Sequence, residues 1–261
     1  MSGHPPTWRL IVTPPATGAE NMALDEALMD RARETGDWVL RIYSWSTPTL
    51  SLGRNQSARG RYDLARMCEL GLGIVRRPTG GRAILHAREI TYSVTAPVSD
   101  AGDLKQSYMR INRLLLEGLQ SLGVDAEVAE PTSRSPTPGM APCFDQPSAG
   151  ELTVGGRKLA GSAQWRADGA LLQHGSILIA DDQSQLSSLA IGGGPLIPAP
   201  ATLSEALGRV PSVCDVGEAL SGAIERSEGT RPDELEIDDT LRTRTASLVV
   251  RYSDDAWTWR R

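Results

Sequence analysis

The chain has 261 residues, of which 40% are hydrophobic and 23% charged, a composition ordinary for a globular protein with a full core. Its net charge is −5, and no tract combines basic with aromatic residues, so we expect no nucleic-acid partner. Apolar runs fall short of a membrane span, and the N-terminus lacks the basic and apolar regions of a signal peptide. We therefore expect a cytoplasmic protein without a membrane partner.

The three cysteines, Cys68, Cys143 and Cys214, are an odd and sparse set, which argues against a disulfide framework. No CxxC motif and no histidine pair at helical spacing occurs, so we expect neither a metal site nor a bound cofactor. Only Lys105 and Lys158 are lysines among the 27 basic residues. Lysine can give up its proton and arginine cannot, so their retention hints at a chemical role, although chance explains it equally well.

In the first half of the chain, helical and strand patterns follow one another. Apolar residues at helical spacing predict helices at 21–36, 61–71 and 103–123. Runs rich in β-branched and aromatic residues predict strands at 38–45, 48–53, 73–86 (two strands around Gly80-Gly81) and 89–97.

The ends and faces of these helices carry further expectations. In the first helix Asn21 is the expected N-cap and Gly36 the stop, with Asp25 on the charged face opposite the apolar one. In the second helix Cys68 is expected to be a buried or half-buried structural thiol.

In the second half, a proline-rich loop at 130–142 precedes Cys143. Turn signals at Gly155-Gly156 and Asp168-Gly169 predict a three-stranded antiparallel meander over 151–179. A flexible connection at 191–201 leads to a helical remainder with a last β-like turn at 247–259. We expect an α+β protein with a core domain at 1–190 and a C-terminal helical extension, 191–261, packed on it.

Residues 76–86 form the first candidate site. Adjacent glycines, Gly80 and Gly81, let backbone N–H groups approach a ligand, and Arg76, Arg77 and Arg82 add positive charge. This combination suits an anionic or carbonyl-bearing ligand. A plain hairpin turn with solvated arginines explains the spacing equally well.

Three further segments carry candidate chemistry. Cys143 follows the proline-rich loop, where a thiol can be exposed and reactive, although an isolated cysteine is more often inert. Lys158 follows a glycine turn and could lower a thiol pKa or stabilise an oxyanion; the alternative is an exposed surface lysine. His174 interrupts an apolar strand, where a structural histidine is the commoner explanation. The motifs GxGxxG, GxxxxGK[ST] and GxSxG are absent.

Taken together, the motifs RRPTGGRAILH, EITYSV, GRKLAGSAQ and LLQHGSILI resemble the biotin/lipoate protein ligase and lipoyl transferase superfamily. NMALDEAL and PTLSLGRNQ are similar to that superfamily's first helix and strand pair. The resemblance runs in order over about residues 8–180. It implies a mixed or antiparallel sheet packed by helices on its outer face, the fold shared with class II aminoacyl-tRNA synthetases and biotin synthetase, and a tunnel for an acyl chain.

Within the superfamily, the chain looks most like the ligase-shaped octanoyl-[acyl-carrier-protein]:protein N-octanoyltransferases. ATP-dependent lipoate ligases carry a small residue where this chain has Arg82, and the transferases carry a cysteine in a CFDQPSAGEL-like segment, here Cys143. The tyrosine common before the EL pair is replaced by Gly150, which puts local substrate contacts in doubt.

The resemblance implies two acyl transfers, from octanoyl-acyl carrier protein to Cys143 and then to a lysine of a lipoyl domain or glycine-cleavage H protein. Lys158 would assist the thiolate or polarise the acyl carbonyl. The implied substrate-binding residues are Arg76, Arg77, Thr79, Gly80, Gly81, Arg82, His86, Gly161, Ser162, Ala163, His174 and Gly175.

Both carriers of such a reaction are usually acidic, so docking requires a local basic patch. The sequence suggests Arg76, Arg77, Arg82, Arg157, Lys158 and Arg166. Two alternatives stay open: an ATP-dependent lipoate–protein ligase, in which Lys158 binds the adenylate phosphate, and a non-catalytic member of the fold.

Overall fold

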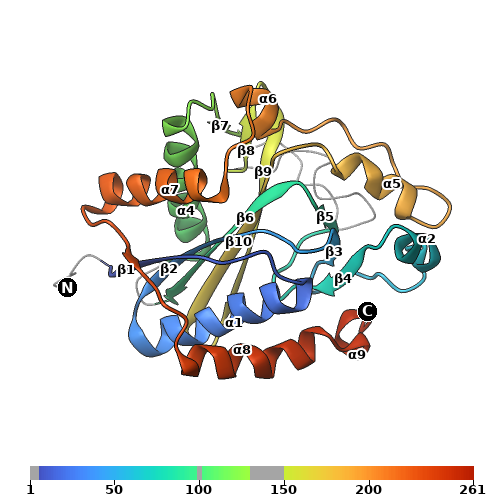
Figure 1. Ribbon diagram of the computed structural model, residues 1–261, viewed down its shortest axis with the longest axis horizontal. Coiled ribbons are helices and arrows are strands. Elements are labelled where there is room, and N and C mark those ends of the chain that lie inside the picture. The colour runs from blue at the N-terminus through green and yellow to red at the C-terminus, as the bar shows by residue number, and fades with distance from the viewer. Residues whose placement is uncertain (1–5, 99–101, 130–149) are drawn as a thin grey trace.

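A computed structural model describes residues 6–98, 102–129 and 150–261 of the chain (Figure 1). The predicted loop at 130–142 and Cys143 lie outside the described residues. The strands are β1 (Trp8–Val12), β2 (Trp38–Tyr43), β3 (Thr49–Leu52), β4 (Gly73–Arg76), β5 (Ile84–His86), β6 (Glu89–Pro97), β7 (Glu127–Val128), β8 (Leu152–Val154), β9 (Arg157–Ala167), β10 (Ala170–Leu178) and β11 (Asp233–Glu234).

The helices confirm the predicted mixture of helices and strands. They are α1 (Gly18–Thr35), α2 (Leu64–Glu69), α4 (Leu104–Ser121), α5 (Leu186–Leu189), α6 (Leu203–Leu207), α7 (Val213–Glu228), α8 (Asp239–Tyr252) and α9 (Asp255–Thr258), with one 3₁₀ turn at Gln183–Gln185. Along the described residues, no helix combines the length and apolarity needed to cross a membrane.

The larger sheet has eight strands in the order β11-β1-β2-β6-β10-β9-β8-β7. Strands β11, β1 and β2 run parallel, and from β2 to β7 each neighbouring pair is antiparallel. The predicted meander over 151–179 is confirmed as β8, β9 and β10, with Gly155, Gly156 and Asp168 in positive-φ turns. Strands β1, β7 and β11 were not predicted from the sequence.

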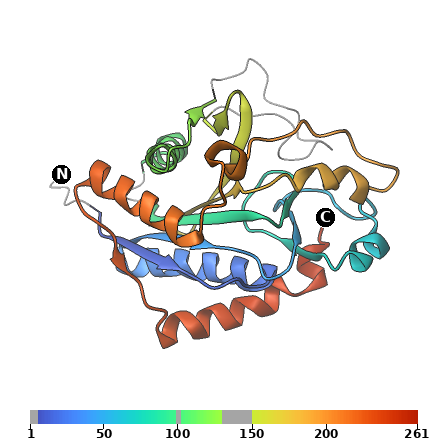
Figure 2. The ribbon, with the colours of Figure 1, turned by 45° about the horizontal axis from the view of Figure 1, so that its top comes forward.

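Helices cover both faces of this sheet (Figure 2). On one face α4 and α7 bury Ile111, Leu115, Val216 and Leu220 against the sheet in the largest hydrophobic cluster. On the other face α1 lies on the sheet and α8 packs along α1. The resemblance implied helices on the outer face alone; α1 needs cover on two sides because residues around its circumference are buried.

A smaller sheet, β4-β3-β5, stands beside the larger one. β4 runs parallel to β3 and β5 antiparallel to it, so the strands flanking Gly80-Gly81 do not pair with each other. The hairpin interpretation of residues 73–86 is therefore wrong. The segment between β4 and β5, residues 77–83, is instead a loop at the edge of the site, here called the glycine loop.

Two details of α1 differ from expectation. Its N-cap is Thr17, whose side chain forms a capping box with Glu20, whereas Asn21 lies inside the helix and donates to the carbonyls of Ala16 and Ser44. Asp25 is fully buried, because partners outside the helix satisfy its carboxylate. Gly36 ends the helix in the left-handed conformation, as predicted.

The C-terminal end is helical where a β-like turn was expected. Asp238 and Asp254 cap the starts of α8 and α9, and these caps favour helix over the β propensity of residues 247–250. Cys68 is exposed, so the expectation of a buried thiol was wrong, because α2 turns only Met67 inward. A domain boundary near residue 190 stays a prediction.

Candidate functional site

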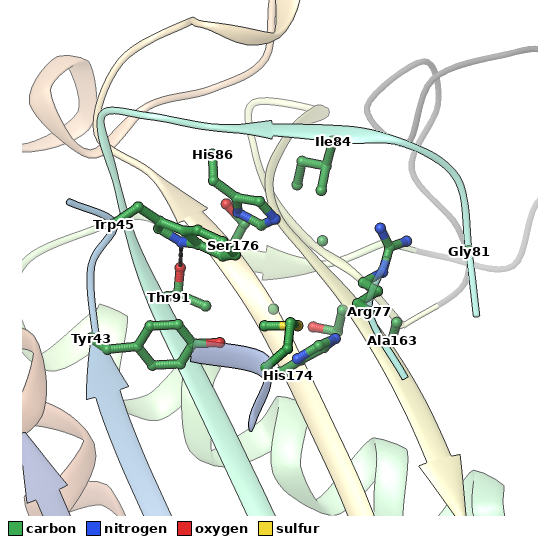
Figure 3. Close-up of a pocket in the computed structure, with 14 residues that line it drawn as sticks. Tyr43, Trp45, Arg77, Gly81, Ile84, His86, Thr91, Ala163, His174 and Ser176 are labelled. Atoms are coloured by element: carbon green, nitrogen blue, oxygen red, sulfur yellow. Dashed lines mark hydrogen bonds between the residues drawn. The ribbon is translucent and has the colours of Figure 1, made fainter. Parts of the chain in front are cut away.

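A pocket opens between the two sheets, next to the glycine loop (Figure 3). Its empty space, including the part open to solvent, is about 450 Å³. It is lined by Met22, Tyr43, Trp45, Arg77, Gly81, Ile84, His86, Thr91, Gly161, Ser162, Ala163, His174, Gly175 and Ser176.

His174 connects the larger sheet to the glycine loop. Its Nδ1 lies 3.1 Å from Asp25 Oδ2, and its Nε2 lies 2.6 Å from Thr79 Oγ1. Burial lowers the pKa of His174 below its usual value, although Asp25 opposes this, so we assign a neutral ring at pH 7. The carboxylate then requires the proton on Nδ1, and the Thr79 hydroxyl donates to Nε2.

Asp25 lies behind His174 and accepts hydrogen bonds from several buried side chains. It accepts hydrogen bonds from Arg41 (2.8 Å), Tyr43 (2.9 Å) and Ser93 (2.8 Å). Burial raises the pKa of Asp25, but Arg41, His174 and Ser93 together outweigh burial and hold the pKa below its usual value. The carboxylate is therefore ionised, and it fixes both Tyr43 and His174 at the pocket wall.

His86 lies on the opposite wall in a similar arrangement. We call each such set of carboxylate, histidine and hydroxyl a relay, so that His174 with Asp25 and Thr79 is the first and His86 is the second. Its Nδ1 lies 2.7 Å from Glu89 Oε1 and its Nε2 lies 2.8 Å from Ser51 Oγ. The imidazole stacks on Trp45 with ring centroids 3.9 Å apart, and Trp45 Nε1 donates to Thr91 Oγ1 (2.8 Å), the dashed line in Figure 3. Trp45 therefore presents an apolar ring to the cavity while its one polar atom is satisfied.

The arginines before the glycine loop are structural supports. Arg76 is fully buried and donates to the carbonyls of Gly53 (2.6 Å) and Thr258 (2.8 Å). Arg77 is also buried and donates to the carbonyls of Gly80 and Arg82, which braces the loop from inside. The expectation of solvated arginines was wrong, because unpaired backbone carbonyls of the loop need these donors.

Lys158 is buried as well, not exposed. Its Nζ lies 2.7 Å from Glu151 Oε2, and its exposed fraction is 3%. Since Arg76, Arg77 and Lys158 are all buried, the predicted docking patch cannot form as expected. Arg157 is exposed, but it pairs with Glu205.

Comparison with known proteins places these features in a family. The family model described as lipoyl protein ligase A/B catalytic domain matches residues 17–225. The chain belongs to this family.

Relatives and structures of the lipoyl protein ligase A/B family extend the match. The chain is 38% identical to a Kyrpidia tusciae protein named octanoyltransferase LipM, over 98% of this chain and 99% of the relative. It is 47% identical to the octanoyltransferase LipM of Carboxydothermus hydrogenoformans, over 69% and 68%. A solved T. acidophilum putative lipoate protein ligase with bound lipoic acid has a TM-score of 0.79 at 23% identity, covering 98% of this chain and 100% of that chain.

The structure brings most of the predicted residues together in this family's fold. Eight of them line the pocket: Arg77, Gly81, His86, Gly161, Ser162, Ala163, His174 and Gly175. Thr79 touches the pocket through His174, whereas Arg76, Gly80, Arg82 and Lys158 are not among its lining residues.

Six lining residues were not predicted from the sequence: Met22, Tyr43, Trp45, Ile84, Thr91 and Ser176. The signal for Ser176 was available, because it directly follows the predicted site residues His174 and Gly175 in a predicted strand.

Close packing of β9 against β10 explains why the residue after His174 is a glycine. A Cβ at Gly175 would lie 2.5 Å from the carbonyl oxygen of Gly161 and 2.6 Å from the Tyr92 ring. β9 and β10 therefore approach each other at the pocket floor more closely than a side chain allows. Within the described residues, no group of His, Cys, Asp and Glu side chains forms a metal site.

Proposed function

We propose that this chain is an octanoyltransferase that moves an octanoyl group from an acyl carrier to the lysine of a lipoyl domain. The observation that supports this proposal best is the full-length similarity to proteins named octanoyltransferase LipM. The pocket agrees with it, because Met22, Trp45 and Ile84 offer apolar surface for a short acyl chain. Gly81 of the glycine loop and Ser162 of β9 also line it.

The proposed reaction uses Cys143 as a nucleophile in two balanced steps. The Cys143 thiolate attacks the donor thioester, the new enzyme thioester forms, and the carrier thiolate leaves and takes up a proton. The amine of the acceptor lysine then attacks the enzyme thioester, the amide forms, and the Cys143 thiol is regenerated. No nucleotide is needed, because the donor thioester is already activated.

Lys158 is the proposed partner of these steps. A buried ammonium held by Glu151 is a fixed positive charge, which favours a nearby thiolate or the oxyanion that forms on the acyl carbonyl. We propose octanoyl-acyl carrier protein as the donor, and a lipoyl domain or glycine-cleavage H protein as the acceptor. Arg82 is half-buried within the glycine loop, and it stands where the resemblance implies a small residue in the ligases that form an adenylate.

Intact mass spectrometry after mixing with octanoyl-acyl carrier protein, without ATP or Mg²⁺, tests the proposal. We expect one octanoyl adduct that is lost in Cys143→Ala and kept in Cys68→Ala and Cys214→Ala. Lys158→Ala should slow acylation strongly, whereas Lys105→Ala, the other lysine and an exposed one, should not. An octanoyl adduct on Cys143→Ala would overturn the assignment of Cys143 as the nucleophile. Attachment of free lipoate only with ATP, equally well by Cys143→Ala, would favour the ligase alternative.

A further inference from the structure

Arginines from two distant parts of the chain gather beside the pocket. They are Arg54, Arg59, Arg61 and Arg260, here called the arginine rim. Arg260 Nη2 donates to the carbonyl of Arg54 (2.7 Å), and Arg59 Nε donates to the carbonyl of Trp259. These contacts hold the end of the chain against the loop after β3 (Figure 1).

The arginine rim adjoins the pocket through Arg54. Its backbone N–H donates to the Thr79 carbonyl (2.7 Å), so this residue is bonded directly to the glycine loop. Its guanidinium lies over the Trp165 ring, 4.6 Å from the centroid. Trp165 is on β9, the strand whose residue Ala163 lines the pocket. A partner lying on the rim would therefore reach the pocket opening.

The positive charge of the rim is not balanced within the described part of the chain. No carboxylate there forms an ion pair with any of the four arginines, whereas exposed arginines elsewhere, such as Arg209 and Arg231, do pair with carboxylates. The nearby Asp63 instead caps α2. An anion would have to come from outside.

The guanidinium groups also repel one another. Burial lowers the pKa of Arg260, and the charges of Arg54 and Arg261 lower it further. Burial and the charges of Arg260, Arg261 and Arg77 likewise lower the pKa of Arg76 to about 10. All remain cations at neutral pH, so an anionic partner would relieve this repulsion.

We propose that the arginine rim docks the acidic carrier that donates the acyl group, a role that rests on the proposed function. The donor brings an acidic surface and an arm with a phosphodiester to the pocket opening, and both favour clustered guanidinium groups. The acceptor domain is usually acidic as well, but the group that it inserts is a lysine in place of an arm with a phosphodiester, and the rim repels that positive charge. The rim therefore discriminates in favour of the donor at the entrance.

The double variant Arg59→Glu/Arg61→Glu tests this role, because both side chains are exposed. The matched control is Arg113→Glu/Arg242→Glu, which makes the same charge change on α4 and α8. Acylation is measured with octanoyl-acyl carrier protein and with a small octanoyl thioester. We expect the carrier reaction of the rim variant to slow at least about tenfold and to lose its salt dependence, with the small thioester reaction within about twofold.

Several outcomes would overturn the proposal. They are an unchanged carrier reaction, an equal loss with both donors, or a raised KM for the lipoyl-domain acceptor alone. The milder variant Arg59→Gln/Arg61→Gln repeats the test should charge reversal impair folding. Failure of the unmodified protein to react with either donor would instead refute the proposed function, so the two failures are distinguishable.

Discussion

Two buried histidines border the pocket in similar relays that are anchored differently. Each ring places Nδ1 on a carboxylate and Nε2 on a hydroxyl: His174 on Asp25 and Thr79, His86 on Glu89 and Ser51. The hydroxyls differ in their setting. Ser51 lies in β3, where backbone ladder bonds hold it on both sides, whereas Thr79 lies in the glycine loop.

The carboxylates differ as well. Asp25 forms a buried ion pair with Arg41, whereas Glu89 accepts from His86 and from the hydroxyls of Thr91 and Ser176. The same side-chain pattern therefore serves two purposes. The His174 relay fixes a loop that has no ladder. The His86 relay instead connects residues of regular strands: Ser51 is in β3, which pairs with β5, and Glu89 begins β6 of the larger sheet.

The largest effect is expected when the carboxylates are neutralised. Asp25→Asn leaves the buried Arg41 guanidinium without its counter-charge, which should lower the free energy of unfolding by about 3–5 kcal/mol. Glu89→Gln leaves two hydroxyl donors and one imidazole with a weaker acceptor, which should lower the free energy of unfolding by about 1–3 kcal/mol. Urea unfolding of both variants measures the difference. Equal losses would show that the Arg41 ion pair does not separate the relays.

The next test removes the hydroxyls. Thr79→Val and Ser51→Ala each leave a buried imidazole nitrogen without its donor, so both should lose about 1–3 kcal/mol of stability. Thr79→Val should also raise KM for a small octanoyl thioester about tenfold, because the loop is displaced. Ser51→Ala should change KM less than about twofold, since Arg77 keeps its bond to the Ser51 carbonyl. A larger KM effect at Ser51 would reverse our assignment of the two relays.

The smallest effect concerns pH. The pKa of His174 is lowered by burial, so the folded state binds its proton less readily than the unfolded state does. Its contribution to stability is complete above the unfolded pKa of about 6.5 and is lost as pH falls below that value, by at most about 1.4 kcal/mol per pH unit. Comparing His174→Gln with the unmodified protein at pH 7.5 and 5.5 should show a shallower loss in the variant. Equal losses of stability in the two proteins between pH 7.5 and 5.5 would contradict the lowered pKa of His174.

Local patterns of the sequence predicted much of this arrangement. Runs of β-forming residues and two glycine-containing turns located the meander of β8, β9 and β10, and the histidine within it lies at the pocket. The glycine loop was likewise predicted to be part of the site. These features depend on residues that are close in sequence.

Long-range partners could not be predicted in the same way. An acid in a helix ordinarily indicates a solvated face, so Asp25 gave no sign of its bond to His174 149 residues later. Arg76 and Arg77 looked solvated for the same reason, because the carbonyls they satisfy belong to other segments. The arginine rim could not be predicted from the sequence, because Arg260 is separated from Arg54 by 206 residues.

The bond between Arg76 and the Thr258 carbonyl has a consequence for biosynthesis. A ribosome adds about 5–20 residues per second, so roughly 9–36 seconds pass between synthesis of β4 and synthesis of its last support, 182 residues later. Trp257, which donates to the Arg76 carbonyl, arrives equally late. During that interval β4 and the glycine loop that follows it lack the contacts from residues 257 and 258. A chain released before residue 257 should therefore mature into a protein whose acyl site is loosened, even though the strands that form it were made long before.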